Sequence, residues 1–157
     1  MGKVFTHTSR KPMSPEKVKK GLSAFRNPSK WPDWNSNARN LLATKAETMD
    51  EGDRLAIFQM VKGSLIETKW LVNYVREGDS YCEIELIGEG QSRNERPIAK
   101  GLKNLLISIT FLYQDDGGIE VHASCEVSML LAVFSRQING FMKNQAEQFL
   151  TDLSSIE

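Results

Sequence analysis

The strongest constraint on the fold is the helical periodicity of the C-terminal segment, residues 130–153. Its large apolar side chains recur at spacings that place them within a sector of about 140° on a helical wheel. Arg136, Lys143 and Glu147 lie on the opposite side of the wheel. At about 1.5 Å per residue, such a helix is long enough to span a curved sheet. The apolar sector contains Leu130, Leu131, Phe134, Ile138, Phe141, Met142, Phe149 and Leu153.

The segment before this helix has the pattern of an antiparallel sheet. Runs rich in β-branched and aromatic residues are separated by Asp- and Gly-containing turn sequences at 50–52, 77–79 and 115–118. Along 119–127, apolar and polar residues alternate, which is typical of a strand with one dry and one wet face. The pattern predicts strands over 38–46, 53–61, 67–76, 79–88, 102–114 and 118–129, and a long polar loop over 89–101.

The first part of the chain predicts a strand followed by two short helices. Residues 3–10 are rich in strand-forming residues. Ser14 can cap the free amide groups of the next helix, and Pro15 at its first position loses no hydrogen bond. A second helical turn begins at Asn27 and ends near Trp34. The predicted order is therefore strand, two short helices, six strands and a long helix, within a single domain over residues 1–157.

This order, together with one sequence motif, resembles the START-like superfamily. The motif is Phe25 followed by Trp31-Pro32-Asp33-Trp34-Asn35 after the first helix, and residues 141–153 resemble the closing helix of that group. The superfamily includes the polyketide cyclase and dehydrase-like proteins and shares its fold with the major birch pollen allergen. The resemblance implies an α+β helix-grip fold. A curved antiparallel sheet of about seven strands would surround a long C-terminal helix, with a cavity between them that holds a small apolar molecule.

Composition excludes several other classes of function. Twenty basic and twenty acidic residues cancel, which argues against a nucleic-acid-binding protein. Residues 1–30 are locally basic, either as a solvated helix face or as a patch for anions or for transient membrane contact. Cys82 and Cys125 fall on the apolar side of predicted strands and behave as small hydrophobes. We expect no metal site, no cofactor, no transmembrane segment and no signal peptide, and a cytoplasmic monomer or homodimer.

The titratable residues offer no catalytic arrangement that spacing alone supports. His7 lies in the first predicted strand, and His122 falls on the wet face of the last one. A catalytic histidine needs a partner that orients it and a substrate within reach. Two pairs of carboxylates, Glu83 with Glu85 and Glu120 with Glu126, also fall opposite the apolar residues and are expected to be solvated. We therefore predict no catalytic residue and lean towards a protein that is not an enzyme.

Gln145 is the polar residue that the helical pattern singles out. It falls between Phe141 and Phe149 in the apolar sector, where an unpaired amide would cost roughly 1–3 kcal/mol. Either it bonds to the sheet backbone or it is a polar group inside a cavity. The expected mouth lies near Trp34 and the 89–101 loop. The predicted cavity residues are Phe25, Trp34, Ile57, Gln59, Trp70, Val72, Tyr74, Ile84, Ile107, Ile109, Phe111, Val121, Ala123, Phe134, Ile138, Phe141 and Gln145.

Three hypotheses for function follow. The first is a protein that binds or transports a small apolar, lipid-like or polyketide-like molecule. The second is an enzyme of the aromatase/cyclase kind, which needs a titratable or strongly polar group inside the cavity. The third is a protein-interaction module similar to the chaperone activators, which a side-chain-filled interior and an exposed apolar patch would favour.

Overall fold

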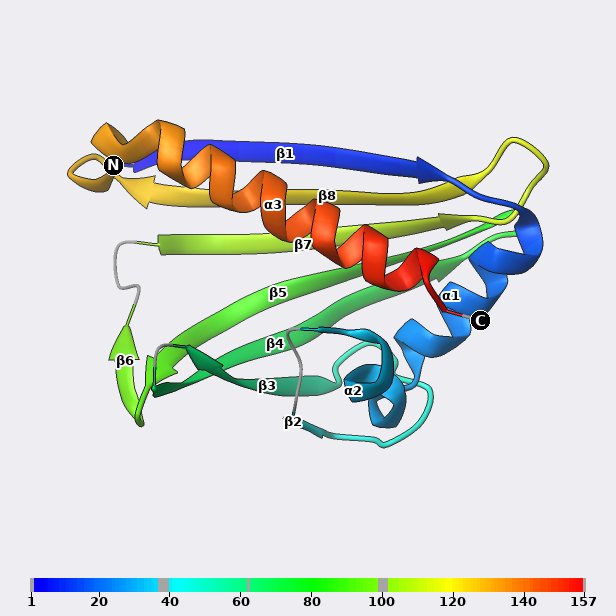
Figure 1. Cartoon of the computed structure of the whole chain (residues 1–157), viewed down its shortest axis with the longest axis horizontal. Coiled ribbons are helices and arrows are strands. Elements are labelled where there is room, and N and C mark those ends of the chain that lie inside the picture. The colour runs from blue at the N-terminus through cyan, green and yellow to red at the C-terminus, as the bar shows by residue number, and fades with distance from the viewer. Residues whose placement is uncertain (1, 37–39, 62, 99–101, 157) are drawn as a thin grey trace.

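The strands of the chain form one antiparallel sheet in the order β1-β8-β7-β5-β4-β3-β2, and β6 pairs with β5 (Figure 1). A computed structural model describes residues 2–36, 40–61, 63–98 and 102–156. The described strands are β1 (Gly2–Pro12), β2 (Asn40–Ala43), β3 (Arg54–Val61), β4 (Ser64–Glu77), β5 (Tyr81–Arg93), β6 (Arg96–Ile98), β7 (Leu102–Leu112) and β8 (Gly118–Ser128). The helical elements are α1 (Pro15–Arg26), η1 (Pro28–Lys30), α2 (Trp31–Trp34), η2 (Leu131–Phe134) and α3 (Ser135–Ser154).

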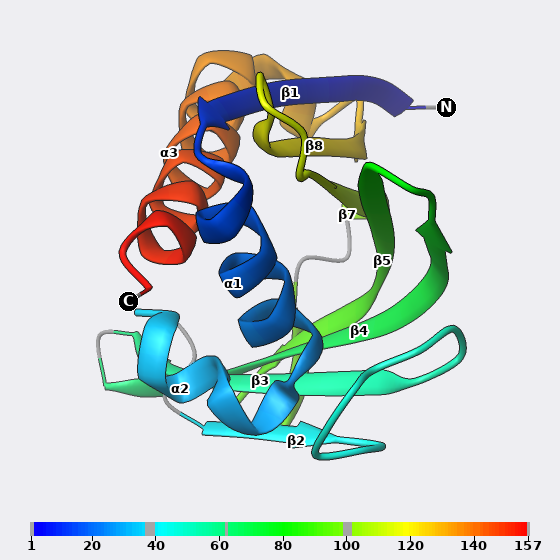
Figure 2. The ribbon, with the colours of Figure 1, turned by 90° about the vertical axis from the view of Figure 1, so that its right-hand side faces the viewer.

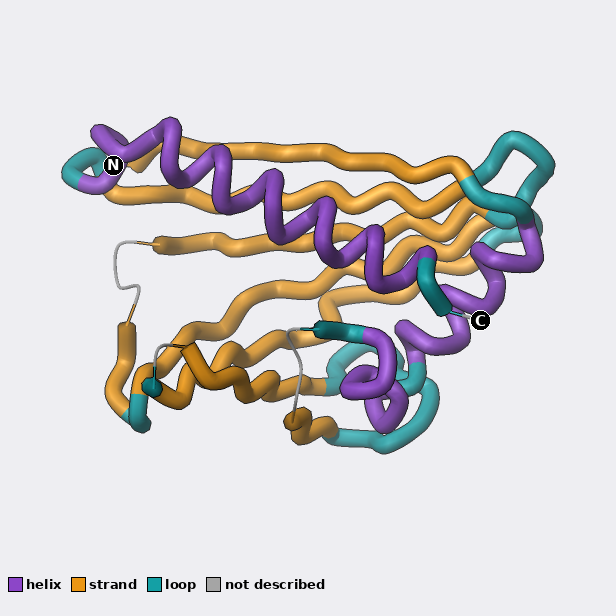
Figure 3. The backbone as a smooth tube through the Cα atoms, in the orientation of Figure 1, coloured by secondary structure: helices purple, strands orange, loops and turns teal. Residues whose placement is uncertain are grey.

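The sheet bends around the helices, which lie on its concave side (Figures 2 and 3). The long helix α3 runs diagonally over β1 and β8, while α1 and α2 cover one end of the sheet. The expected α+β helix-grip architecture is therefore confirmed, with a curved sheet, short helices after the first strand and a long C-terminal helix. Among the described residues, no helix combines the length and the apolar character needed to span a bilayer.

Helix α1 begins where the sequence predicts and packs tightly against the end of the sheet. The Lys17 amide donates to Ser14 Oγ at 3.4 Å, and Pro15 occupies the first helical position. Phe25 is fully buried near the other end of the helix. Gly21 lets the helix approach closely, because a Cβ atom there would lie 3.1 Å from Cδ1 of Ile119. These contacts fix the direction in which the chain continues into α2.

Two β-bulges in the β4–β5 pair change which side chains face the helices. Val72 pairs with Leu86 and Tyr74 with Glu85, so Asn73 is the extra residue between them. After this bulge Val75 packs against the core, and Tyr74 lies on the opposite face of the sheet. The sequence prediction for Tyr74 assumed unbroken alternation, which a bulge interrupts.

The second bulge lies on β5. Trp70 pairs with Gly88 and Lys69 with Gly90, which leaves Glu89 as the extra residue. Alternation then resumes with Gln91 opposite Thr68, and both side chains face the helices. Both bulges increase the local twist of the sheet, and the one at Glu89 also brings the polar side chain of Gln91 to its concave face.

The loop predicted over 89–101 is wrong for residues 89–98, which form the end of β5, a tight turn and β6. Arg93 pairs with Arg96, and the two turn residues, Asn94 and Glu95, have φ angles of 48° and 70°. Positive φ at both positions is typical of type I′ hairpin turns. The polar composition of this segment hid the strand signal, because such residues have low strand propensity. Residues 99–101 lie outside the described residues.

The hairpin turn gives a prediction about stability. Glu95→Gly is expected to raise the free energy of unfolding by up to about 1 kcal/mol, because glycine adopts a positive φ without the steric cost of a side chain. Urea denaturation followed by circular dichroism measures the change. The control Arg96→Gly, one position further and in strand β6, is expected to lower stability instead. A fall in stability for Glu95→Gly would show that the turn is not strained at this position.

Candidate functional site

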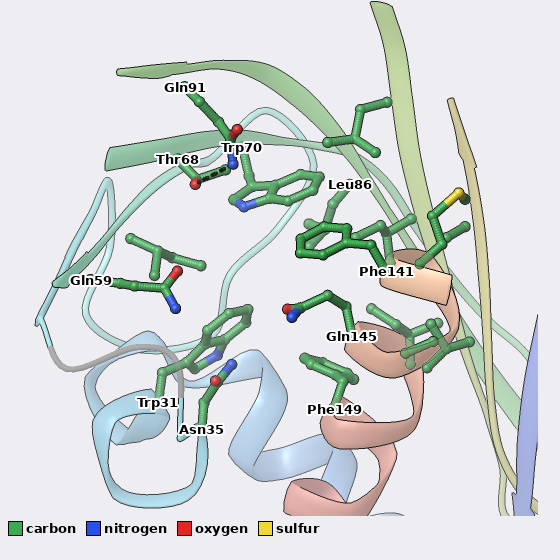
Figure 4. A pocket seen from close by; sticks show the side chains of 18 residues that line it. Trp31, Asn35, Gln59, Thr68, Trp70, Leu86, Gln91, Phe141, Gln145 and Phe149 are labelled. Carbon is green, nitrogen blue, oxygen red and sulfur yellow. Dashed lines mark hydrogen bonds between the residues drawn. The ribbon is translucent and has the colours of Figure 1, made fainter. Parts of the chain in front are cut away.

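A cavity of about 240 Å³ opens between α3, the α2 segment and the concave face of the sheet. Strands β3, β4, β5, β7 and β8 supply its sheet-side wall. Figure 4 shows the side chains that surround it. They are Trp31, Asn35, Ile57, Gln59, Thr68, Trp70, Leu86, Gln91, Leu105, Ile107, Ile109, Val121, Ala123, Phe141, Met142, Gln145, Ala146 and Phe149.

Aromatic rings from three elements form the largest part of the wall. Trp31 is held in place because its Nε1–H donates to the carbonyl oxygen of Phe25 at 2.7 Å. The Phe149 ring lies edge-on to Trp31, with 6.5 Å between the ring centroids. Trp70 extends from β4 towards the same space, and Phe141 lines the cavity while its side chain is 65% exposed. The cavity is therefore apolar and flat-sided, with one ring accessible from solvent.

The polar groups of the wall are neutral. They comprise the carboxamides of Asn35, Gln59, Gln91 and Gln145 and the hydroxyl of Thr68. Nε2 of Gln91 donates to Thr68 Oγ1 at 3.1 Å, which orients that amide across the top of the cavity (Figure 4). None of the described residues that line the cavity carries a titratable side chain.

Gln145 points into the centre of the cavity from α3, between the rings of Phe141 and Phe149 (Figure 4). The sequence leaves two alternatives open for Gln145. Among the described residues it forms no hydrogen bond to the sheet backbone, so it is a polar group inside the cavity. The amide is exposed rather than buried, so it avoids the cost of an unpaired polar group in the core. It offers one donor group and one acceptor to whatever occupies the cavity.

The structure brings together about half of the residues that the sequence predicts for the cavity. These residues share a position either on the inward face of a strand or on the inward side of α3. They are Ile57, Gln59, Trp70, Ile107, Ile109, Val121, Ala123, Phe141 and Gln145.

Five further predicted residues lie in the core beside the cavity rather than on its wall. Val72, Ile84 and Phe111 are fully buried and belong to the main hydrophobic cluster. Phe25 lies in the same cluster, and Trp34 is half-buried against Phe149 with ring centroids 5.5 Å apart. Their apolar periodicity is the same as that of a cavity wall, so sequence alone does not separate the two environments.

The last three predicted residues are not part of the cavity wall. Tyr74 is on the outer face of the sheet, where its hydroxyl donates to Glu83. Phe134 is on η2 and is 51% exposed. Ile138 packs against the second hydrophobic cluster, beside Phe5.

Several wall residues were not predicted as cavity residues. Trp31 belongs to the motif that carried the family resemblance, and Phe149 belongs to the apolar sector of the last helix, so a signal for both was present. Gln91 faces inward only because of the bulge at Glu89, which the sequence does not reveal, whereas Thr68 shares the inward face of β4 with Trp70 by ordinary alternation. The complete set is Trp31, Asn35, Thr68, Leu86, Gln91, Leu105, Met142, Ala146 and Phe149.

A hydrogen-bonded clasp joins the segment after α2 to the last turns of α3. The amide and the hydroxyl of Ser36 both donate to Oδ2 of Asp152, at 3.0 Å and 2.9 Å. Nε2 of Gln148 donates to the other carboxylate oxygen at 2.9 Å. Asn35 is the neighbour of Ser36 and lines the cavity, so the clasp fixes one side of the cavity relative to α3. The expected mouth at Trp34 and the 89–101 segment stays a prediction.

The titratable groups singled out in the sequence lie elsewhere. His7 Nε2 is 2.7 Å from Ser9 Oγ, and His122 Nδ1 is 2.7 Å from Thr8 Oγ1. Glu85 accepts a hydrogen bond from Asn73 on the outer side of the sheet at 2.7 Å. Among the described residues, no group of His, Cys, Asp and Glu is arranged to hold a metal ion.

Both cysteines are buried in the core. Burial raises the pKa of the Cys82 thiol to about 11 and also raises the pKa of Cys125. Cys125 Sγ lies 3.9 Å from Sδ of Met142. Since only a thiolate is a good nucleophile or metal ligand, these neutral thiols act as packing groups, as the sequence predicts.

Comparison with known proteins gives matches at the level of structure. No family model and no curated protein matches the sequence. A hypothetical protein from Helicobacter pylori shares 15% identity with a TM-score of 0.68, over 96% of this chain and 86% of that chain. A START superfamily protein from Mycobacterium smegmatis shares 12% identity with a TM-score of 0.61, over 96% and 94%.

A third similar structure is norcoclaurine synthase from Thalictrum flavum in complex with dopamine and hydroxybenzaldehyde. It shares 14% identity with a TM-score of 0.61, over 96% of this chain and 86% of that chain. At these identities the likenesses show the fold alone. They confirm the START-like helix-grip fold that the motif around Trp31 implies.

The two motif tryptophans give a prediction about the wall. Trp31→Phe is expected to lower the free energy of unfolding by about 1–3 kcal/mol, because the buried carbonyl of Phe25 loses its donor. The control Trp34→Phe removes a longer bond of 3.3 Å from a half-buried ring and is expected to cost less, below about 1 kcal/mol. Urea denaturation of both variants measures the difference. Equal losses would show that the Trp31 hydrogen bond does not hold the wall in place.

Proposed function

We propose that this protein binds a small, uncharged and mainly apolar molecule in the cavity beneath α3. The observation that carries the proposal is the composition of the wall, in which aromatic and aliphatic side chains surround neutral carboxamides and no titratable group. Ligand sites are generally apolar with a few polar groups that set orientation. A cavity of about 240 Å³ favours a compact ligand over a long lipid.

The energy of binding would come from burial of apolar surface, at roughly 25 cal/mol for each Å² removed from water. Trp31, Trp70 and Phe149 supply flat surfaces for this contact. A charged ligand would lose its hydration without gaining a counter-ion from the wall, which is costly. The site is therefore expected to select against carboxylates and ammonium groups.

Orientation would come from the carboxamides. Gln145 offers a donor and an acceptor at the centre of the cavity, and the Gln91 amide is already oriented by Thr68. A hydroxyl, carbonyl or amide on the ligand would meet one of these groups. Because a carboxamide both donates and accepts, the wall tolerates several neutral polar groups rather than one.

The similar structures support this proposal without identifying a ligand. The norcoclaurine synthase structure contains dopamine and hydroxybenzaldehyde, so a protein with this fold holds small aromatic molecules. The absence of a titratable side chain among the described wall residues gives no acid or base for proton transfer. Binding or transport is for this reason favoured over an aromatase/cyclase reaction. A cytoplasmic location fits the two free thiols.

Native mass spectrometry of the purified protein, followed by organic extraction, tests whether a small molecule accompanies the chain. The expected result is a neutral apolar compound at a stoichiometry near one. Isothermal titration with naphthol provides a defined probe if the protein is purified empty. Gln145→Trp fills the cavity from the inward side of α3 and is expected to abolish naphthol binding.

The matched control for this variant is Asn144→Trp, which adds the same ring to the same helix at an exposed position outside the wall. Its affinity for naphthol is expected to equal that of the unchanged protein. Equal loss in both variants would place the binding site elsewhere. An empty protein that binds neither naphthol nor any extracted compound would overturn the proposal.

The neutral wall gives a separate prediction about selectivity. At neutral pH naphthoate is expected to bind at least about tenfold more weakly than naphthol, because its carboxylate is desolvated without a partner. Comparable affinity for the two compounds would mean that the carboxyl group stays in solvent at the mouth. Gln145→Glu is expected to weaken naphthoate further by like-charge repulsion while the protein stays folded, as thermal denaturation would show.

A further inference from the structure

The connection between β8 and α3 exposes a continuous apolar run, Met129–Phe134, which we call the apolar tip. None of the residues of η2 within it is buried. The exposed fractions reach 83% for Leu130 and 76% for Val133, with 61% for Met129 and 51% for Phe134. In Figure 1 this connection extends past the ends of β1 and β8 at one end of the sheet.

The fold itself makes little use of these side chains. The inward contacts of the C-terminal helix begin later, with Ile138 and Met142, which pack against the second hydrophobic cluster. Isolated exposed apolar residues are common on protein surfaces, but a contiguous group usually marks an interaction site. The apolar tip therefore indicates a contact outside the chain.

Three exposed cations lie on the elements that adjoin the apolar tip. Lys3 pairs across the sheet with Val127, Lys103 pairs with Glu126, and Arg136 follows the tip in the first turn of α3. All three side chains are exposed, and none forms an ion pair with a described residue. Glu126 is the acidic group among them, and its carboxylate already accepts a hydrogen bond from Asn104 at 2.9 Å. The end of the molecule is therefore apolar at its tip and basic around it.

We propose that the apolar tip inserts into the interfacial layer of an anionic membrane, with Lys3, Lys103 and Arg136 against the lipid headgroups. Shallow insertion of apolar side chains combined with basic residues at headgroup level is the general chemistry of peripheral membrane attachment. A protein partner fits less well, because a stable interface uses about 20–30 residues on each side. A short protruding connection offers too little surface for that, whereas a bilayer accepts a convex shape.

The position of the tip has a consequence for the cavity, and this step alone rests on the proposed function. Phe134 and Phe141 lie seven residues apart on the same helical stretch, or about 10 Å along a helix axis. Phe141 lines the cavity and is 65% exposed. Insertion of the tip would bring this exposed side of the cavity wall close to the bilayer surface, so an apolar ligand would cross little water on its way to or from the membrane.

Vesicle flotation of the full chain tests the proposal without any cavity ligand. The probes are vesicles of phosphatidylcholine alone and vesicles that also contain phosphatidylserine. We expect binding to the anionic vesicles and much weaker binding to the neutral ones. The double variant Leu130→Asp/Val133→Asp is expected to lower the partition coefficient by more than about tenfold, and Lys103→Glu by at least about fivefold.

The control is Leu42→Asp, which places one carboxylate, against two in the double variant, on a strand residue that is 65% exposed and distant from the tip in sequence. It is expected to leave flotation unchanged. Equal loss in the control, or unchanged binding of the double variant, would overturn the proposal. The proposal would also be overturned if the double variant changed the oligomeric state measured by light scattering but left flotation unchanged, because the tip would then be an interface between copies of the chain. Naphthol binding in the same variants separates this result from a failure of the proposed function.

Discussion

The aromatic cluster around Phe25 is the contact on which the rest of the structure depends. Its ring lies 5.2 Å from Trp31, 5.6 Å from Phe111 and 5.8 Å from Phe149, between ring centroids. These residues come from α1, α2, β7 and α3, so one buried ring joins the two short helices, the sheet and the long helix. Since the same Trp31 and Phe149 side chains also face the cavity, the core and the candidate site share a wall.

This shared wall affects how a ligand would be accommodated. Trp31 is buried and its indole donates a hydrogen bond to the main chain, whereas Phe141 on the other side of the cavity is 65% exposed, so less of its ring is packed against the protein. One side of the cavity is accordingly rigid and the other adaptable. Pre-organised walls favour affinity because little conformational entropy is lost on binding, and an adaptable side permits ligands of different outline.

The sequence predicted the order of the elements well because their signals are local. The Ser14-Pro15 start of α1, the glycine-containing turns and the alternation along β8 each act within a few residues. Predictions failed where the outcome depends on pairing between strands. The turn at Asn94 and Glu95 and the bulges at Asn73 and Glu89 are properties of two strands together.

The same difference between local signals and strand pairing explains which residues of the candidate site could be predicted. Ile109 and Ala123 lie where β7 and β8 pair in regular register, beyond the irregularity between Lys103 and Leu106, and they face inward as alternation requires. Alternation does not tell whether an inward residue packs against another side chain or faces a cavity. Phe111 and Ile84 both face inward but are packed in the core. Gln91 required the Glu89 bulge before it could face the cavity at all. A sequence pattern therefore shows that a side chain faces inward, but not how deep within the concave face it lies.

The clasp between Ser36 and Asp152 bears on the rate of ligand exchange separately from the affinity, two properties that are often linked in binding proteins. Asp152 holds the segment beside Asn35 against α3 but is not itself part of the cavity wall. A change at this carboxylate would alter how often that side of the cavity moves apart from the helix. If the clasp is equally strong with and without a ligand, uptake and release would speed up or slow down by the same factor, and the dissociation constant would stay unchanged. Exchange kinetics and affinity can therefore evolve independently in this chain.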